Sequence, residues 1–564
     1  MINYKNEVVE LLYSQDIGLE KEVIEGLIEI PPEYHMGDYA FPCFSLAKVM
    51  RKNPNMISEE IAKKLESKYF EKIENVGPYI NFFIDKEIFM ADTVSTVLDK
   101  KERYGSSNIG KGKNIVIEYS STNIAKPFHI GHIRSTVIGD SLKKIFKFGG
   151  YNVTSINYLG DYGTQFGVMI SAYKKWGDKE KIDRDPINEL LSLYVRYNEA
   201  AKEDESLMDE ARDWFFKLEN GDEEAVKIWS WFKELSLEKF QKVYDLLDIE
   251  FDNYHGESYN SQFMPWAYEE LEKKGLLEES EGAIVINMGE DEPPAIIKKS
   301  NGSSTYITRD VATAMNRKRV YDFDKNIYVV ASQQNLHFKQ LREILSKMGY
   351  DWANDCVHVP FGMVSMEDGS MSTREGRVVF LEDVLNKSIE KTKVIMEEKN
   401  PSLEGKDEIS KIVGIGAVKF QELFNNRIKD YTFNWDEVLN FDGETGPYVQ
   451  YTFVRAKSIF DKSDFNSENI DFSKLNSDEE ITLTREIYNL VGAIDKARIK
   501  YEPSIITRQL INIASAFNKF YNSTHIINNK DLEEKNAQLA LVLATMYSIK
   551  NGLSLLGIKT PERM

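Results

Sequence analysis

A histidine-glycine motif at a predicted strand-to-helix turn constrains this chain more than any other feature. The motif, His129-Ile130-Gly131-His132, stands between an apolar run at residues 115–117 and a helical pattern over residues 133–148. The apolar run predicts a buried strand. A helix that begins just after a strand presents unpaired N–H groups and a partial positive charge at its first turn. The turn is therefore a natural seat for an anion such as a triphosphate.

The residue types in the motif suit a nucleotide. Histidines three positions apart lie on one face of the first helical turn, so His129 and His132 can act together. Gly131 between them removes a side chain where a base or ribose must approach closely. The alternative is a pair of surface histidines at a helix cap, because a four-residue motif matches by chance easily.

The surrounding pattern predicts a parallel, doubly wound sheet. Strand-like runs at residues 115–118, 153–158, 326–331 and 357–361 alternate with helical stretches, which is typical of this Rossmann-like architecture. A charged stretch over residues 174–260 indicates a helical insertion, with polar, loop-like breaks expected at residues 178–185 and 203–209. Its tryptophans, Trp214, Trp229 and Trp231, are interpreted as internal packing.

The flanking regions predict two further domains. Residues 1–105 mix helical stretches with short strands, including a turn that enters a strand near residue 79, and indicate an α+β domain. Residues 396–564 are expected to be all helical, with an apolar helix over residues 539–556 that Gly557 ends. We therefore predict domains at 1–105, 106–395 and 396–564, in a multidomain α/β plus α chain.

Composition excludes several classes. The only cysteines, Cys43 and Cys356, are far apart in the sequence, so neither a disulfide framework nor a zinc site is indicated, which is consistent with a reducing compartment. The start has no basic-then-apolar signal and no segment is long and apolar enough to span a membrane, so we expect a cytoplasmic protein. The net charge of −20 alone would not suggest RNA, although binding depends on local patches.

Further motifs carry a family resemblance. They are Ser121-Thr-Asn-Ile-Ala-Lys-Pro127, Gly160-Asp-Tyr-Gly-Thr-Gln-Phe-Gly167, Tyr306-Ile-Thr-Arg-Asp310, Ala331-Ser-Gln-Gln334, Met371-Ser-Thr-Arg374, Gly446-Pro-Tyr-Val-Gln-Tyr451 and Pro561-Glu-Arg-Met564. With these motifs the chain resembles the class I aminoacyl-tRNA synthetases, and the arginyl-tRNA synthetase family in particular. The motifs follow in family order from the lead-in to the histidine box to the last residue.

The resemblance implies an activity and an amino-acid pocket. Such an enzyme converts L-arginine and ATP, with Mg²⁺, to arginyl-adenylate and then charges the terminal 2′-hydroxyl of tRNA(Arg), and it needs bound tRNA for the first step. The implied arginine-binding residues are Glu118, Asn123, Tyr306, Asp310 and Gln334. A guanidinium demands carboxylates and planar acceptors, so Asp310 and Tyr306 are assigned to it and the others to the α-amino and carboxylate end. Asp310 could also be an ordinary helix cap.

The second class signature departs from its usual form. Where a Lys-Met-Ser-Lys-Ser loop is expected, the chain has Ser370-Met371-Ser372-Thr373-Arg374, so both lysines are missing. Members of the arginyl family commonly carry a lysine before the histidine box instead, here Lys126. We predict that Lys126 supplies the missing cation beside His129 and His132, with Ser372, Thr373 and Arg374 as further catalytic candidates and Met371 and Ser372 at ATP. Asp161 could lie near the ribose or serve only a turn.

The resemblance also implies RNA contacts. Tyr79 and Asn81 are candidates for the tRNA elbow, whereas Tyr448, Tyr451, Tyr521 and Met564 are candidates for the anticodon, where exposed rings stack on splayed bases. A monomer without a protein-held metal is expected. Rival readings are a class I synthetase for another amino acid, a nucleotidyltransferase that never touches tRNA, and a non-catalytic RNA-binding paralogue. The missing lysines favour the paralogue, whereas intact His129, His132 and Lys126 oppose it.

Overall fold

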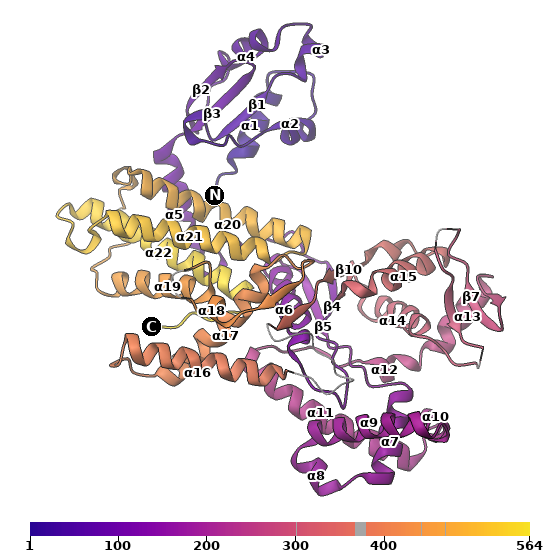
Figure 1. Ribbon diagram of the computed structural model, residues 1–564. Coiled ribbons are helices and arrows are strands. Elements are labelled where there is room, and N and C mark those ends of the chain that lie inside the picture. The colour runs from indigo at the N-terminus through magenta and orange to yellow at the C-terminus, as the bar shows by residue number, and fades with distance from the viewer. Residues whose placement is uncertain (291, 301, 367–378, 441–442, 469) are drawn as a thin grey trace. The chain divides into compact units, whose positions relative to one another are not determined.

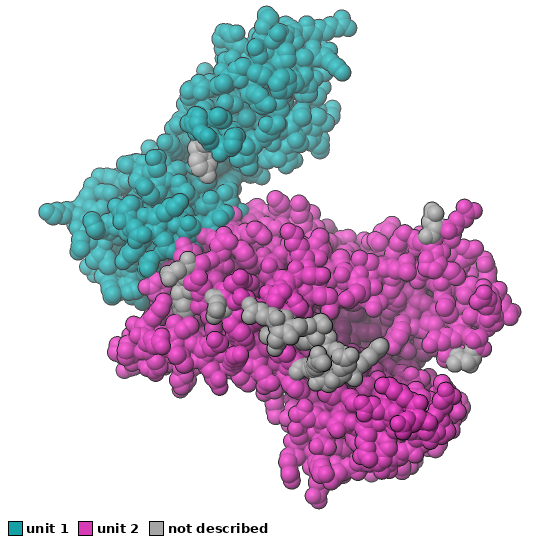
Figure 2. All heavy atoms as spheres, in the orientation of Figure 1, with its two compact units in different colours: residues 1–104, 455–490, 512–549 teal, residues 105–454, 491–511, 550–564 magenta. Residues whose placement is uncertain are grey.

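The computed structural model describes residues 1–564 except 291, 301, 367–378, 441–442 and 469. The chain divides into two compact units, which Figure 2 colours separately. Unit 1 comprises residues 1–104, 455–490 and 512–549, and unit 2 comprises residues 105–454, 491–511 and 550–564. The last long helices therefore contribute residues to both units. The three domain boundaries expected from the sequence stay predictions.

The N-terminal part of unit 1 is an α+β domain, as predicted. Its antiparallel sheet has the order β1-β3-β2 (Tyr39–Pro42, Tyr79–Ile84 and Phe70–Val76). Phe41 and Phe82 are fully buried in its core together with Tyr4. Its helices are α1 (Tyr4–Tyr13), α2 (Lys21–Leu27), α3 (Leu46–Met50), α4 (Pro54–Ala62) and α5 (Lys86–Lys100).

Unit 2 is built on a four-stranded sheet in which all strands are parallel (Figure 1). The order is β10-β9-β4-β5, with bounds Cys356–Phe361, Lys325–Ala331, Asn114–Glu118 and Asn152–Ile156. The four predicted runs overlap these strands, although the run at residues 153–158 extends two residues beyond the end of β5. Ile115, Val116 and Ile117 are at most 1% exposed, because both faces of a parallel sheet are covered. The doubly wound architecture is thereby confirmed.

The helical insertion follows β5. Its helices are α7 (Thr164–Trp176), α8 (Lys179–Arg184), α9 (Pro186–Glu203), α10 (Ser206–Glu219) and α11 (Glu223–Leu247). The loop expected at residues 178–185 is wrong, because α8 occupies most of it. The Asp178 side chain accepts from the N–H groups of Glu180 and Lys181, and such a cap stabilises a short polar helix. The second break is confirmed but lies only between Glu203 and Ser206.

The chain then returns to the sheet through a small antiparallel sheet. The elements on this path are α12 (Glu257–Ser261), α13 (Met264–Lys273), β6 (Glu278–Ser280), β7 (Ala283–Ile286), β8 (Ala295–Lys298) and α14 (Tyr306–Tyr321), and α15 (Asn335–Lys347) comes after β9. Helix α14 packs its apolar face into a core with Val116 and Tyr328 of the parallel sheet. This packing sets the start of α14 near the carboxyl ends of the strands.

Among its described residues, the C-terminal region is helical except for one short strand. Its helices are α16 (Leu381–Lys399), α17 (Lys406–Phe424), α18 (Trp435–Val438), α19 (Gly446–Asp461), α20 (Asp478–Lys500), α21 (Ser504–Ser523) and α22 (Leu532–Leu555). Strand β12 (Tyr431–Phe433) was not predicted, because it exists only by pairing in parallel with β11 (Val364–Met366). Gly557 has φ +68° and follows the last helix as expected. No helix in the described ranges is long and apolar enough to cross a membrane.

Candidate active site

The histidine motif forms the first turn that leads into a long helix. A short 3-10 turn, η3 (Ile130–His132), runs directly into α6 (Ile133–Phe148). Nδ1 of His129 accepts from the N–H of Gly131 at 3.1 Å, and Nδ1 of His132 accepts from the N–H of His129 at 3.2 Å. The two rings lie 3.9 Å apart between centroids. The predicted strand-to-helix turn is thus present.

Both imidazoles are held neutral. Burial, reinforced by the charge of Lys126, lowers the pKa of His129 to about 4. Burial, together with His129 and Lys126, lowers the pKa of His132 to about 3. Because each Nδ1 accepts a backbone N–H, the ring hydrogen must sit on Nε2 in both residues. Each Nε2–H is therefore left as a hydrogen-bond donor at the start of the helix.

The loop between β4 and the histidines is strained and pinned. Ser120, Ser121 and Ala125 have φ values of +70°, +50° and +59°, a conformation that costs non-glycine residues free energy and is common at functional sites. The N–H of Ala125 donates to Oγ of Ser236 on α11 at 3.0 Å. Asn123 pairs with Gly160 as an isolated bridge, so the loop is aligned beside the motif at residues 160–167, which we call the glycine-rich loop.

Glu118 ends β4 and forms a buried ion pair. Its Oε2 lies 2.6 Å from Nη2 of Arg317 on α14, and both side chains are almost fully buried. Burial raises the pKa of Glu118, and the charge of Arg317 opposes that shift. Glu118, which we predicted for the α-amino and carboxylate end of the substrate, is therefore paired with Arg317, a residue that the sequence did not indicate.

Asp310 lies in the first turns of α14 and is held by side chains from two other elements. Its Oδ2 is 2.6 Å from Nε2 of His337 on α15, and its Oδ1 accepts from the hydroxyl of Tyr158 at 3.3 Å. Burial disfavours a charge on His337, but the hydrogen bond and the charge of Asp310 outweigh it and raise the His337 pKa. The α14 cap is Thr305, so Asp310 is not the residue that caps this helix.

A second carboxylate lies beside Asp310. Glu257, at the start of α12, is 9% exposed, and its Oε1 is 3.1 Å from Nη1 of Arg309. Burial raises the pKa of Glu257 to about 7; Arg309 opposes the shift, whereas Asp310 and Asp161 add to it. Tyr306 stands nearby, 66% exposed, with its ring centre 5.5 Å from the Arg309 guanidinium. Glu257 had no periodic or motif signal in the sequence.

The carboxylate of Asp161 makes its hydrogen bonds with other residues of the protein. Asp161 is fully buried, and its carboxylate accepts from Nζ of Lys233 at 2.6 Å and from the N–H and hydroxyl of Ser258 at 2.8 and 2.6 Å. Its backbone oxygen accepts from Nε1 of Trp229. These contacts join the glycine-rich loop to α11 and α12, so Asp161 has a structural role in this loop.

The remaining predicted residues are placed unevenly. Lys126 lies just before the histidines, with its Nζ 5.6 Å from the Tyr194 ring centre. Gln334 ends a short 3-10 turn, η4 (Ser332–Gln334), directly after β9 and is exposed. Met371, Ser372, Thr373 and Arg374 fall within residues 367–378, outside the described residues.

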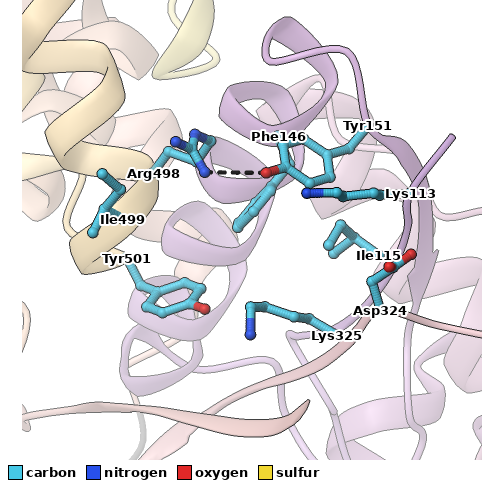
Figure 3. A pocket seen from close by; sticks show the side chains of 9 residues that line it. All are labelled: Lys113, Ile115, Phe146, Tyr151, Asp324, Lys325, Arg498, Ile499 and Tyr501. Atoms are coloured by element: carbon cyan, nitrogen blue, oxygen red, sulfur yellow. Dashed lines mark hydrogen bonds between the residues drawn. The ribbon is translucent and has the colours of Figure 1, made fainter. Parts of the chain in front are cut away.

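A cavity of about 360 Å³ lies at the opposite edge of the sheet (Figure 3). Its lining is Lys113, Ile115, Phe146, Tyr151, Asp324, Lys325, Arg498, Ile499 and Tyr501. Lys113 and Lys325 stand at the amino ends of β4 and β9, whereas ligands of open parallel sheets bind at the carboxyl ends. Lys325 and Arg498 each have a carboxylate partner, Asp355 and Asp495. The cavity is therefore not the candidate active site.

The comparison with known families decides the classification. Residues 93–435 match the family described as tRNA synthetases class I (R), catalytic domain. The chain belongs to the arginyl-tRNA synthetase family. Residues 5–84 match the arginyl-tRNA synthetase N-terminal domain, and residues 449–564 match the DALR anticodon-binding domain. The family expected from the motifs is thereby confirmed.

Relatives of this family cover the whole chain. The arginine–tRNA ligase of Halothermothrix orenii is 56% identical over 100% of both chains, and that of Clostridium kluyveri is 54% identical over 98% of both. Among solved structures, the arginyl-tRNA synthetase of Thermus thermophilus aligns with a TM-score of 0.84 at 24% identity, covering 100% and 99% of the two chains, and shows the fold. That of Plasmodium falciparum aligns with a TM-score of 0.79 at 27% identity, covering 95% and 94%.

The predicted RNA-contacting residues differ in exposure. Tyr451 and Tyr521 are each 38% exposed, and Arg455 stacks on the Tyr521 ring at 5.1 Å. Tyr448 and Met564 are half-buried, as is Tyr79, whereas Asn81 is only 6% exposed. Met564 packs against the Met396–Ile409–Val413 cluster. The rings of Tyr451 and Tyr521 thus keep exposed surface, whereas Asn81 has almost none.

Proposed function

We propose that this chain is an arginine–tRNA ligase. It would activate L-arginine with ATP and transfer the arginyl group to the 2′-hydroxyl of the terminal adenosine of tRNA(Arg). The observation that carries the proposal is the pair of neutral imidazoles at the start of α6, just beyond Lys126 and at the carboxyl ends of the strands, where Asp310 and Glu257 also lie. Full-length relatives named arginine–tRNA ligase support it.

Activation requires an attack between two anions. An oxygen of the arginine carboxylate forms a bond to the α-phosphorus of ATP, and the bond from that phosphorus to the bridging oxygen breaks, so pyrophosphate leaves. Negative charge grows on the phosphate oxygens. The Nε2–H donors of His129 and His132 and the free N–H groups of the helix start stabilise this charge, since preorganised donors favour the transition state. A neutral imidazole donates this hydrogen bond and keeps its Nε2 proton throughout.

The cation that the signature loop lacks is assigned to Lys126. Its charge contributes to the lowered pKa values of both His129 and His132, so the ammonium lies close to the two rings. Pro127 biases Lys126 toward an extended backbone. Ser372, Thr373 and Arg374 remain candidates for the same site by sequence, with Met371 and Ser372 at ATP.

Mg²⁺ is assigned to the ATP triphosphate. Within the described ranges no three histidine, cysteine, aspartate or glutamate side chains gather as a metal-binding group, so these residues do not fit a protein-held ion. A magnesium ion that is largely coordinated by water and phosphate needs no such group.

The amino-acid pocket suits a guanidinium. Asp310 and Glu257 present carboxylates close enough for one to raise the pKa of the other, and Arg309, itself a guanidinium, already pairs with Glu257. A substrate guanidinium would bind Asp310, with Tyr306 covering its plane and Glu257 adding negative charge. We assign Glu118, Asn123 and Gln334 to the α-amino and carboxylate end, with Glu118 acting through its pair with Arg317.

The partners are L-arginine, ATP and tRNA(Arg), and a cytoplasmic monomer fits them. The N-terminal domain with Tyr79 and Asn81 is assigned to the tRNA elbow. The helical domain with Tyr448, Tyr451, Tyr521 and Met564 is assigned to the anticodon. A pocket with two carboxylates disfavours a class I synthetase for an uncharged amino acid, because an unpaired buried charge is costly.

The test is pyrophosphate exchange with each of the twenty amino acids, with and without tRNA(Arg), followed by charging of the tRNA. We expect exchange with arginine alone among the amino acids and formation of arginyl-tRNA. Exchange with another amino acid would support the other-synthetase alternative. No exchange with any of them, while tRNA still binds, would indicate the non-catalytic paralogue.

A further inference from the structure

Arg134 is a buried arginine that the proposed chemistry does not use. It lies on α6, two residues after His132, and its side chain is fully buried together with that of Glu422 on α17. Nε of Arg134 is 3.6 Å from Oε2 of Glu422, and the Tyr431 hydroxyl donates to the other oxygen of that carboxylate. A buried charge is costly unless it is paired and hydrogen bonded. The Nη1 and Nη2 donors of Arg134 must therefore find other hydrogen-bond acceptors.

The guanidinium of Arg134 donates hydrogen bonds to backbone carbonyl oxygens. Nη1 donates to the oxygens of Gly362 at 3.1 Å and Lys429 at 2.7 Å, and Nη2 points to the oxygen of Asn426 at 3.4 Å. Only the five-donor fork of arginine can bridge separate carbonyls while also facing a carboxylate. Arg134 thus joins α6 to the connection between β10 and β11, and to the segment that precedes β12.

These contacts hold the stretch that leads into residues 367–378. The N–H of Gly362 donates to the oxygen of Arg427 at 2.7 Å, and the N–H of Met363 donates to Oδ1 of Asp430 at 2.6 Å. A Cβ at Gly362 would lie 2.6 Å from the carbonyl carbon of Lys429, so the approach leaves no room for a side chain. Strand β11 follows and pairs with β12 from Val364 to Met366.

The stretch that follows residues 367–378 is held by the histidine motif itself. The N–H of Ile130 donates to the oxygen of Val379 at 3.0 Å, and the N–H of Leu381 donates to the oxygen of Phe128 at 2.9 Å. His129 and Phe380 form an antiparallel bridge. Both flanks of the sequence that contains Met371–Arg374 are therefore bonded to the region from Phe128 to Arg134.

We propose that Arg134 is a positioning residue for adenylate formation. By binding the carbonyls of Gly362 and Lys429, it holds the first turn of α6, and with it the His129–His132 donors, in place beside β11. It touches no substrate. A small displacement of reacting groups costs up to about a hundredfold in rate, so its loss should appear in catalysis with ATP more than in the use of arginine. The inference rests on the proposed function only for the reaction that is measured.

The deciding variant is the double substitution Arg134→Met with Glu422→Leu. Replacing a buried pair by apolar residues of similar volume leaves no lone charge and often keeps stability, but methionine cannot bridge the carbonyls. We expect a melting temperature near wild type, a kcat for tRNA-dependent pyrophosphate exchange about 10- to 100-fold lower, and a raised KM for ATP. The KM for arginine should change little. Wild-type kcat and KM for ATP in a folded double variant would overturn the proposal.

Lys419→Met is the matched control. Lys419 is an equally buried cation on α17, the helix that carries Glu422, but it donates to the oxygens of Leu247 and Gly557 and not to Gly362. We expect this variant to lower the melting temperature with kcat and KM for ATP close to wild type. An equal loss of kcat in Lys419→Met would assign the effect to general destabilisation and overturn the proposal.

A surface variant keeps the test open if the double variant does not fold. Asp430 is exposed, so Asp430→Ala removes the bond to the Met363 N–H without disturbing the core. The KM for ATP should rise and kcat should fall several-fold, in the same direction as for the double variant, and an unchanged Asp430→Ala enzyme would count against the proposal. Absence of arginine-dependent exchange in the wild type would instead refute the proposed function, so the two failures are distinguishable.

Discussion

Oδ2 of Asp310 lies 2.6 Å from Nε2 of His337, across the gap between the first turns of α14 and α15. The pair is one-fifth exposed on each side, so it is reachable from solvent yet largely desolvated. A protonated His337 would neutralise the carboxylate that we assign to the substrate guanidinium. Arginine must therefore compete with, or replace, an internal cation at Asp310.

Asp310→Asn should weaken the use of arginine. The substitution keeps the shape and removes the charge that faces the guanidinium, so we expect a loss of about 2–5 kcal/mol in kcat/KM for arginine, as for a truncated buried charge pair. The KM for ATP should change little and discrimination against citrulline should shrink. Steady-state kinetics with both substrates measure this. Asp322→Asn, on an exposed aspartate that directly follows α14, is the control; wild-type kinetics in Asp310→Asn would remove Asp310 from the pocket.

The histidine motif should make the fold less stable in acid. The folded-state pKa values of His129 and His132, about 4 and about 3, lie below the ordinary value of 6.5. Between about pH 4 and 6.5 the unfolded chain binds protons that the folded chain does not, so the free energy of unfolding rises with pH in this window. Urea unfolding should be measured from pH 4.5 to 7.5. The free energy of unfolding should rise less steeply with pH for the double variant His129→Asn/His132→Asn than for the wild type.

The comparison needs a histidine control. His35 lies in the N-terminal domain with a side chain 70% exposed. His35→Asn should leave the pH dependence of the free energy of unfolding as in the wild type. Equal slopes for the wild type and the double variant would mean that the two imidazoles are not held neutral by burial.

Lys126→Ala should slow activation with little effect on arginine binding. Charge builds on the phosphates in the transition state, so losing one preorganised donor should lower kcat by roughly 10²–10³. Lys126→Arg should rescue poorly, because a planar fork does not replace a compact ammonium. Adding Thr373→Lys to Lys126→Ala should recover part of the rate if the two positions supply the same charge.

Lys113→Ala is the control for this series. Lys113 is an exposed lysine at the amino end of β4, at the edge of the sheet away from the histidines, and its loss should leave pyrophosphate exchange unchanged. A wild-type rate for Lys126→Ala would move the missing cation elsewhere, and Arg374 would be the next residue to substitute.

Activation should depend on tRNA. The signature loop lacks both lysines, and such a loop can need substrate contacts to reach its active arrangement. We expect negligible arginine-dependent pyrophosphate exchange without tRNA(Arg) and rapid exchange with it. Exchange measured with arginine and ATP alone, at a rate comparable to that with tRNA, is the result that would refute this prediction.

Local patterns in the sequence were enough for the architecture and the reactive turn. The apolar runs that became β4, β5, β9 and β10 are recognisable because burial on both faces requires continuous apolar residues. The histidine motif stands at the start of α6 because a strand and a helical period meet there. Short-range signals of this kind failed at residues 178–185, where an aspartate cap stabilises a helix in a polar stretch, and at β12, which exists only through its partner strand.

Only the tertiary structure decided which charges meet. Glu118 with Arg317, Asp310 with His337, Glu257 with Arg309 and Arg134 with Glu422 each join residues on different elements, most of them far apart in the sequence. No period or spacing marks such partners, because their meeting depends on how the insertion and the C-terminal helices return to the sheet. Burial then makes each pairing obligatory, since a lone charge inside the protein is too costly to keep.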